Sequence, residues 1–269
     1  MAIGLSTYAF FWRFSETAER PLTLIDMVKK TRELGLSVFQ ICDYAPIQAM
    51  SDAELAEVRD VAETSGIQLE LGTRGIQKTH LMSYLDTASK LGSTFLRTML
   101  HTPDHKPTVP EAIALLKEVL PAFADRGTTI GLETYEQVST EDLIRVVEGV
   151  GSPLLGVCLD PANSVARLEL PVDVIDRTAP FVVNMHVKDF TFTRQAGWVG
   201  FSLIGCPLGD GLLDYDRMIE VVQPADNVNQ VIEHWLPWQR TSKETCQLEE
   251  QWTRHNIDTL RSKPWVLSS

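Results

Sequence analysis

Four residues that can bind a metal ion each lie at the end of an apolar stretch in the second half of the chain. They are Glu133 in TIGLETY, Asp160 in LGVCLDPAN, His186 in VVNMHVKD and Glu233 in VNQVIEHW. Three carboxylates held close together repel each other unless a cation lies among them. Three carboxylates and one imidazole suit a single divalent ion; Mn²⁺, Mg²⁺ or Co²⁺ is favoured and Zn²⁺ is compatible. If these side chains converge, the sequence predicts one metal site.

The stretch VVNMHVKDF, residues 182–190, indicates how such side chains are positioned. Read as a β-strand, its alternation places His186 and Lys188 on one face. Neighbouring strands lie about 4.8 Å apart, so the ends of four consecutive strands can converge. His234, next to Glu233, should face the opposite way, toward a layer of helices, and we interpret it as structural.

Helix and strand signals alternate from one end of the chain to the other. Amphipathic stretches end in a glycine that fits a helix C-cap, and an apolar run follows at once. These glycines are Gly35, Gly66, Gly92 and Gly127. Ser51 with Glu54 predicts a helix that begins with a capping box, and Thr140 is expected to cap the helix that follows it. This alternation predicts βα units and a parallel sheet.

Eight β-strands are predicted, over residues 3–10, 38–44, 67–73, 94–101, 129–135, 155–161, 181–189 and 228–235. Eight strand–helix units in about 250 residues are typical of a (β/α)₈ barrel. The competing doubly wound sheet often carries a glycine-rich fingerprint after its first strand, whereas STYAFFWRF follows here. We therefore predict one α/β domain, a TIM barrel over residues 1–269. Active sites of such barrels lie at the C-terminal ends of the strands, where the four candidate ligands are expected.

The composition argues against several classes of partner. The chain has 269 residues and a net charge of −12, which disfavours nucleic acids and anionic membranes. The N-terminal residues lack the features of a signal peptide, and no apolar run approaches membrane-spanning length. The cysteines are Cys42, Cys158, Cys206 and Cys246. They form no C-x-x-C pair and are expected to be reduced thiols of a cytoplasmic protein, with only Cys158 facing the site, one layer lower.

Residues 190–213 are too long for an ordinary βα connection. They contain four aromatic residues and five glycines. Aromatic side chains between glycine hinges suit a lid that keeps water from a reactive intermediate, or a flap that covers a subunit interface. A C-terminal helix is predicted at about 242–262. We expect a homo-oligomer, either a dimer or a tetramer.

The strand-end residues Glu, Asp, His and Glu, together with the motifs LD and H-x-K-D, resemble those of the xylose-isomerase-like barrels. This family includes sugar isomerases, keto-sugar 3-epimerases, hydroxypyruvate isomerase, inosose dehydratase and endonuclease IV, and the resemblance spans nearly the whole chain. It implies that Glu133, Asp160, His186 and Glu233 bind one divalent ion. It also implies that Glu133 and Glu233 act as an acid–base pair on opposite faces of a small sugar substrate.

One position departs from the pattern of some of these families. Endonuclease IV and many keto-sugar epimerases carry histidine three residues after the strand-six aspartate, where this chain has Asn163. The change, with the acidic composition, disfavours DNA repair, while Asn163 can still hydrogen-bond a substrate hydroxyl or carboxylate. The segments VCLDPANS, ELGTRGI and FTFTRQAGWVGFSLIGCPLGDGLLDY resemble a subgroup generically called sugar phosphate isomerases, which includes a decarboxylase of 3-oxo-isoapionate.

The reaction stays open between three hypotheses. We expect first a divalent-metal-dependent isomerase or epimerase of a keto sugar, which transfers protons through an enediolate. The alternative is a decarboxylase of a 3-oxo sugar acid, which needs an electron sink and a cation that holds the carboxylate. Candidates for that cation are Arg74, Arg97, Lys188 and Arg194. A barrel that binds a sugar without turning it over is the third hypothesis.

Overall fold

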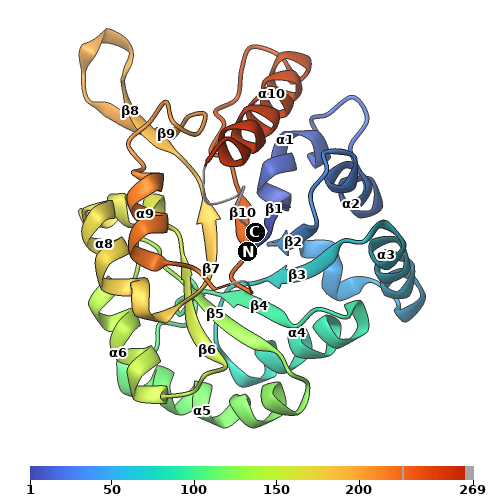
Figure 1. Ribbon diagram of the computed structural model, residues 1–269, viewed down its shortest axis with the longest axis vertical. Coiled ribbons are helices and arrows are strands. Elements are labelled where there is room, and N and C mark those ends of the chain that lie inside the picture. Colours follow the sequence, from blue (N-terminus) through green and yellow to red (C-terminus); the bar gives the residue numbers. More distant parts are fainter. Residues whose placement is uncertain (226, 264–269) are drawn as a thin grey trace.

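The computed structural model describes residues 1–225 and 227–263; residue 226 and residues 264–269 of the predicted domain lie outside the described part. Eight parallel strands form a closed barrel in that part of the chain (Figure 1). They are β1 (Ile3–Ser6), β2 (Val38–Cys42), β3 (Gln68–Gly72), β4 (Phe95–Thr98), β5 (Thr129–Glu133), β6 (Leu155–Leu159), β7 (Val182–Val187) and β10 (Gln230–Ile232). Strand β1 pairs with both β2 and β10, which closes the barrel. The predicted single-domain TIM barrel is confirmed.

All eight predicted strands are present, but each ends earlier in the chain than predicted. The strand predicted over residues 181–189, for example, ends at Val187, and the one predicted over 228–235 ends at Ile232. The residues beyond each end leave the hydrogen-bonded ladder and surround the mouth of the barrel, where polar side chains can face a ligand.

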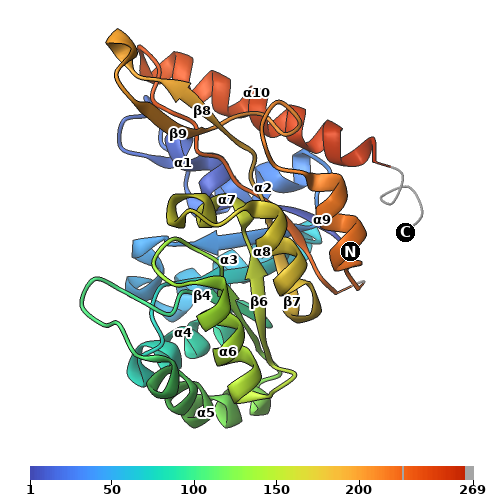
Figure 2. The ribbon, with the colours of Figure 1, turned by 90° about the vertical axis from the view of Figure 1, so that its left-hand side faces the viewer.

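Helices surround the barrel (Figure 2). The α-helices are α1 (Phe11–Phe14), α2 (Leu24–Glu33), α3 (Asp52–Ser65), α4 (Lys78–Leu91), α5 (Val109–Asp125), α6 (Thr140–Val150), α7 (Pro161–Ser164), α8 (Pro171–Thr178), α9 (Tyr215–Val222) and α10 (Ser242–Arg261). The 3₁₀ helices are η1 (Thr7–Phe10), η2 (Ala45–Ala49), η3 (Val165–Arg167), η4 (Ala179–Phe181) and η5 (Ala196–Trp198). Helix α10 lies where the C-terminal helix is predicted. None of the described helices is long and apolar enough to cross a bilayer.

The local helix signals hold with one exception. The four predicted C-cap glycines have φ between 60° and 72°, and the predicted capping box begins α3. The predicted cap at Thr140 is wrong by one residue, because the Ser139 side chain accepts the hydrogen bond from Asp142 N and caps α6. Thr140 is the first helical residue, and its hydroxyl donates to Glu169 Oε2 at 2.8 Å.

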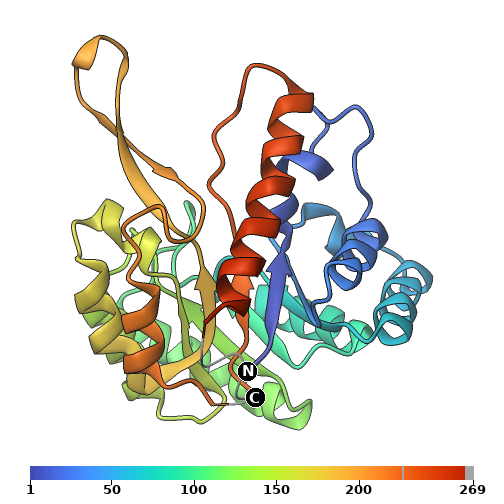
Figure 3. The ribbon, with the colours of Figure 1, turned by 45° about the horizontal axis from the view of Figure 1, so that its top comes forward.

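The long connection after β7 contains an antiparallel hairpin, formed by β8 (Phe190–Arg194) and β9 (Phe201–Gly205). The hairpin projects away from the ring of helices (Figures 1 and 3). In the part farthest from the barrel, Trp198, Val199 and Phe201 have exposed fractions of 76%, 81% and 60%. Leu203, in contrast, packs against the core. The lid and subunit-interface roles of residues 190–213 stay predictions, as does the oligomeric state.

Asp189, the last residue of the H-x-K-D motif, fixes the return of this connection to the barrel. Its Oδ1 accepts hydrogen bonds from the backbone of Phe190 and Leu213, at 2.8 and 2.9 Å. Its Oδ2 accepts from the backbone of Gly209 and Gly211, at 2.9 and 3.0 Å. Gly211 is required at this position because an added Cβ would overlap Asp189 Oδ1. One buried carboxylate therefore accepts hydrogen bonds from the backbone at both the beginning and the end of the connection that contains the hairpin.

The Asp189→Ala variant is expected to lower the free energy of unfolding by about 2 kcal/mol, because four backbone N–H groups lose their acceptor. Urea denaturation followed by circular dichroism measures this change. Asp210→Ala is the control in the same connection, since Asp210 is exposed, and its effect should stay within about 0.5 kcal/mol. Equal stabilities of the two variants would contradict the role of Asp189.

Candidate metal centre and substrate pocket

Four side chains from four adjacent strands converge inside the mouth of the barrel. Glu133 ends β5, Asp160 follows β6, His186 lies in β7 and Glu233 follows β10. His186 Nδ1 lies 3.5 Å from Glu133 Oε1 and 3.6 Å from both Asp160 Oδ2 and Glu233 Oε2. All four residues are at most 3% exposed. The structure thus brings together the four residues that the sequence predicts as metal ligands.

The hydrogen bonds of His186 leave one ring nitrogen open toward the carboxylates. Its Nε2–H donates to Gln40 Oε1 at 2.8 Å; because an amide oxygen only accepts, Nε2 carries the proton. Nδ1 has no hydrogen-bond partner in the described part of the chain. Three carboxylates that point at this nitrogen repel one another, and a cation that binds the nitrogen lone pair between them would offset their charge. The donor set therefore fits one divalent metal ion.

Two buried cations flank the three carboxylates. Lys188 Nζ lies 2.6 Å from Asp160 Oδ2 and 3.2 Å from Glu233 Oε2, and Arg97 Nε lies 2.5 Å from Glu133 Oε2. Although burial opposes both changes, Lys188 lowers the pKa of Asp160, and Asp160 raises the pKa of Lys188. The three ionised carboxylates and the two cations together have a net charge of −1. A divalent ion would therefore give this buried cluster one net positive charge.

The two predicted acid–base glutamates are each oriented by a neighbouring donor. Asn163 Nδ2 donates to Glu133 Oε1 at 2.8 Å, and Ser6 Oγ donates to Glu233 Oε1 at 2.9 Å. Asp160 caps the short helix α7 and accepts the backbone N–H of Asn163, which places the Asn163 side chain beside Glu133. Asn163 also lines a cavity over these carboxylates, where a substrate could reach it; its contact with substrate stays a prediction.

A second group of charges lies at the mouth of the barrel. Asp43 Oδ2 accepts hydrogen bonds from Tyr8 Oη at 2.9 Å and Arg74 Nη2 at 3.0 Å, and lies 3.4 Å from Arg97 Nη2. Burial opposes ionisation, but Arg97 and Arg74 hold the pKa of Asp43 at about 2. Arg97 is buried, whereas the Arg74 side chain is 53% exposed, and its hydrogen bonds to described residues all come from Nη2. Of these two arginines, Arg74 has donors free for a ligand.

A cavity of about 280 Å³ lies over the metal cluster. The predicted site residues that line it are Arg74, Arg97, Glu133, Asn163, Lys188 and Glu233. Trp235, which follows Glu233 by two residues, also lines it. Tyr8, His101 and Tyr135 line it as well, and no strand-end pattern indicates them as site residues. The volume lies near the lower end of the range for small-molecule sites.

Arg194 is the predicted substrate contact that the structure does not bring to the cavity. It belongs to β8, and its guanidinium carbon lies 5.2 Å from the centre of the Trp198 ring and 4.2 Å from that of Phe201. These are cation–π contacts within the projecting hairpin. A contact of Arg194 with substrate stays a prediction that this geometry does not support.

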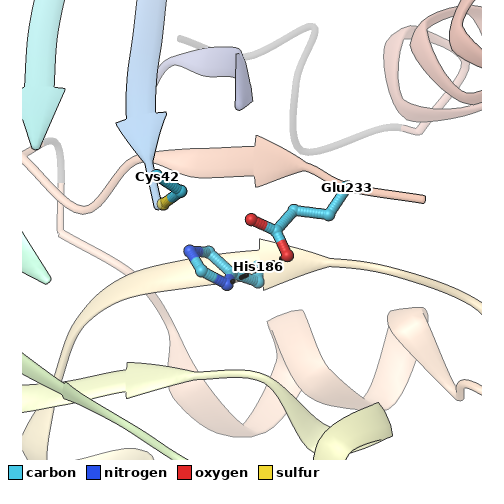
Figure 4. Close-up of side chains that lie close together, drawn as sticks. All are labelled: Cys42, His186 and Glu233. Carbon is cyan, nitrogen blue, oxygen red and sulfur yellow. Dashed lines mark ion pairs between the residues drawn. The ribbon is translucent and has the colours of Figure 1, made fainter. Parts of the chain in front are cut away.

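Cys42 at the end of β2 lies closer to the candidate ligands than expected. Its Sγ and ligand atoms of His186 and Glu233 all lie within 4.8 Å of one another (Figure 4), so the expectation that Cys158 alone of the cysteines faces the site is wrong. Burial raises the pKa of Cys42, and its S–H donates to Gln40 Oε1 at 2.8 Å. The four residues predicted from the sequence remain the proposed ligand set, because the thiolate is the form that binds metals and burial disfavours that form of Cys42.

His234 faces away from the metal cluster, as the strand alternation predicts. Its Nε2 lies 3.1 Å from Thr253 Oγ1 in α10, and the residue is 5% exposed. Burial lowers the pKa of His234 to about 3, so the ring is neutral near pH 7.

A second cavity, of about 380 Å³ and mainly apolar, lies on the His234 side of the site, between the hairpin, Trp12 and Trp235.

The architecture is that of a known family. The family model described as xylose isomerase-like TIM barrel matches residues 28–263. This chain belongs to the xylose isomerase-like TIM barrel family. The family resemblance inferred from the strand-end residues is thereby confirmed.

A curated protein is similar to this chain over almost its whole length. It is 3-oxo-isoapionate decarboxylase of Pectobacterium atrosepticum, which is 55% identical over 264 residues, covering 98% of this chain and 96% of the relative. The uncharacterized protein YihM of Escherichia coli is 21% identical, over 81% of this chain and 67% of that protein.

Several solved structures have the same fold at low identity. D-psicose 3-epimerase in the presence of D-fructose has a TM-score of 0.72 and 16% identity, covering 97% of this chain and 98% of that chain. The IOLI protein with a bound zinc atom has a TM-score of 0.69 and 17% identity, covering 98% and 100%. A family protein from Mycobacterium smegmatis in complex with magnesium has a TM-score of 0.67 and 17% identity, covering 95% and 97%. At these identities the likeness shows the fold alone.

Proposed function

We propose that this chain is a metal-dependent decarboxylase of a 3-oxo sugar acid such as 3-oxo-isoapionate. The observation that carries the proposal is the 55% identity to 3-oxo-isoapionate decarboxylase of P. atrosepticum, which extends over 98% of this chain and 96% of that protein. It favours the decarboxylase hypothesis over the isomerase or epimerase that the sequence led us to expect first.

The charge of the site supports an anionic substrate. With a divalent ion bound, the buried cluster of three carboxylates, Arg97 and Lys188 carries one net positive charge, which complements a monocarboxylate better than a neutral ketose. Arg74 is the proposed carboxylate contact, because its guanidinium has donors free at the cavity. Arg74 is half exposed and already paired with Asp43, so it orients the carboxylate in the bound acid, whose negative charge passes to the enolate when neutral CO₂ departs.

The reaction breaks one carbon–carbon bond and forms one carbon–hydrogen bond. Loss of CO₂ leaves the bonding electrons on the adjoining ketone as an enolate, and the enolate carbon then takes one proton. A divalent ion held by the four candidate ligands would supply positive charge beside the oxygen on which the negative charge develops. Glu133 and Glu233 are the proposed proton-transfer groups. Lys188 Nζ, 3.2 Å from Glu233 Oε2, stays protonated beside the carboxylates and adds positive charge at the cavity, and the proton that reaches the enolate carbon comes from solvent water.

The other two hypotheses have weaker support. An isomerase or epimerase would use Glu133 and Glu233 to take and return a proton, but the likeness to D-psicose 3-epimerase, at 16% identity, shows the fold alone. A barrel that only binds a sugar has no need for buried acceptors that converge on His186 Nδ1. Such a cluster is costly to bury unless a bound ion compensates it.

Incubation of the Mn²⁺-loaded or Mg²⁺-loaded protein with 3-oxo-isoapionate in D₂O tests the proposal. We expect one CO₂ for each acid consumed and one deuterium at the carbon that lost the carboxylate; EDTA should stop the reaction and added metal should restore it. Deuterium exchange into D-psicose or D-fructose, without CO₂ from the acid, would overturn the proposal in favour of an epimerase. Binding of the acid with neither outcome would favour the non-catalytic barrel.

The Arg74→Met variant is expected to raise the KM for the 3-oxo acid about 30-fold, with a smaller change in kcat, because it removes a charge-assisted contact with the carboxylate. Steady-state kinetics of CO₂ release measure both constants. Arg59→Met is the matched control, since Arg59 lies on α3 and pairs with Asp60 at the surface, and its KM should stay within about twofold of wild type. An unchanged KM in Arg74→Met would exclude Arg74 as the carboxylate contact.

A further inference from the structure

A layer of buried polar side chains crosses the barrel beneath the metal cluster. Gln40 of β2 and Asn184 of β7 lie two residues before Cys42 and His186, so they face the interior one layer lower. Glu70 of β3 and Asn229, which precedes β10, complete this layer, and all four residues are at most 5% exposed. The proposed reaction uses none of them.

Glu70 is the common acceptor of this layer. Its Oε1 accepts from Asn229 Nδ2 at 2.6 Å, and its Oε2 accepts from Gln40 Nε2 at 2.9 Å and from Asn184 Nδ2 at 3.0 Å. A buried carboxylate is costly unless its oxygens are hydrogen-bonded, and here three amide groups satisfy them. Because a carboxylate only accepts, each of these amides must turn its NH₂ group toward Glu70.

The orientation of the Gln40 amide determines which nitrogen of His186 carries the proton. With its NH₂ group turned toward Glu70, Gln40 presents Oε1 to its other neighbours, Cys42 Sγ and His186 Nε2, both at 2.8 Å. That oxygen requires a proton on Nε2, which leaves the lone pair of Nδ1 directed at Glu133, Asp160 and Glu233. A reversed Gln40 amide would place its NH₂ group against Nε2 and favour the tautomer with the proton on Nδ1, and Nδ1 would then have no lone pair for an ion among the three carboxylates.

We propose that Glu70 and Gln40 are positioning residues that hold His186 in its metal-binding tautomer. Glu70 fixes the Gln40 amide, and Gln40 fixes the imidazole, so a carboxylate two hydrogen bonds away sets the affinity of the site for its ion. Such outer contacts typically change metal affinity by about 10- to 100-fold. The inference rests on the proposed metal role of His186, and it is independent of which sugar acid the enzyme converts.

Titration calorimetry with Mn²⁺ at one fixed pH tests the inference. We expect Gln40→Met to weaken Mn²⁺ binding about 10- to 100-fold and Glu70→Met to weaken it about 10-fold or more. Glu70→Gln should rescue the affinity to within about threefold of wild type, because glutamine can keep an oxygen toward Gln40 while Asn229 reverses its own amide. Wild-type affinity in a folded Glu70→Met protein would overturn the inference. An equal loss in Glu70→Gln and Glu70→Met would also overturn it, because charge rather than the acceptor would then matter.

Cys42→Ala is the matched control, because it removes the other donor to Gln40 Oε1 without changing which atom of Gln40 faces His186. Its Mn²⁺ affinity should stay within about twofold of wild type. A loss as large as that of Gln40→Met would attribute the effect to general damage of the layer, or to Cys42 as a ligand, and would overturn the tautomer explanation.

A spectroscopic measurement keeps the test valid if the methionine variants do not fold. Long-range ¹H–¹⁵N NMR of the Mg²⁺-loaded wild-type protein reports the tautomer of each histidine, and the His186 signal is assigned by its absence from His186→Ala. We expect a protonated Nε2 and an unprotonated Nδ1; the opposite tautomer would overturn the inference. None of these measurements uses a sugar substrate, so a failure of the proposed decarboxylation would not affect them.

Discussion

The His186→Ala variant is expected to lose high-affinity binding of the divalent ion. Its turnover of substrate should fall by a factor of about a thousand or more. The substitution removes the neutral ligand on which Glu133, Asp160 and Glu233 converge at 3.5–3.6 Å. The remaining three carboxylates then have Lys188 and Arg97 as their buried partners, and the charge beside the developing enolate is lost. Metal analysis after dialysis measures the bound ion, and the rate of CO₂ release measures turnover.

His234→Ala is the control for this variant, because His234 is a buried histidine that follows Glu233 directly and faces α10. It should keep the ion and its activity and lose only about 1–2 kcal/mol of stability from its packing and hydrogen bond. If His234→Ala lost the ion while His186→Ala kept it, the proposed ligand set would be wrong.

The Arg97→Met variant is expected to lower the free energy of unfolding by about 3–5 kcal/mol and to abolish activity, because it leaves buried carboxylates without their partner. Arg97 is 1% exposed, and its guanidinium lies against Glu133 and Asp43 and donates to Thr73 O at 2.9 Å. Denaturation of the metal-free protein separates this loss of stability from any loss of metal affinity.

Arg97→Lys is the comparison variant: it keeps the positive charge but loses the several N–H donors of the guanidinium group. We expect an intermediate stability, since one ammonium cannot reach Glu133, Asp43 and Thr73 O together. Wild-type stability of Arg97→Met would show that the two carboxylates do not depend on Arg97.

The sequence predicted the barrel and the convergence of the four candidate ligands because both depend on local patterns. Strand alternation with strand-end polarity places Glu133, Asp160, His186 and Glu233 correctly, and the same alternation separates His234 from His186. The first strands obey the same rule, with Ser6 and Cys42 at the ends of β1 and β2. Ser6 and Cys42 were not predicted as site residues, because serine and cysteine at a strand end carry no charge that would indicate a site.

Other parts of the site depend on contacts between segments far apart in the chain. The position of Arg194 follows from the direction of the β8–β9 hairpin, which residue types alone do not determine. The hydrogen bond from Asn163 to Glu133 follows from the way Asp160 caps α7. Glu70 in QLELG reads as one polar residue in an apolar strand, and only the closed barrel shows that it meets three amides.

The three-residue strand β10 has a consequence for the biosynthesis of the protein. It fills the gap between β1 and β7, and the hydrogen bond from Ser6 to Glu233 spans 227 positions. During translation the first strand therefore keeps an open edge until almost the whole chain has left the ribosome. A chain that terminates before Gln230 exposes the edges of β1 and β7 to aggregation and lacks a proposed metal-binding carboxylate. Barrel closure and completion of the site thus occur in one step, and a prematurely terminated product has neither.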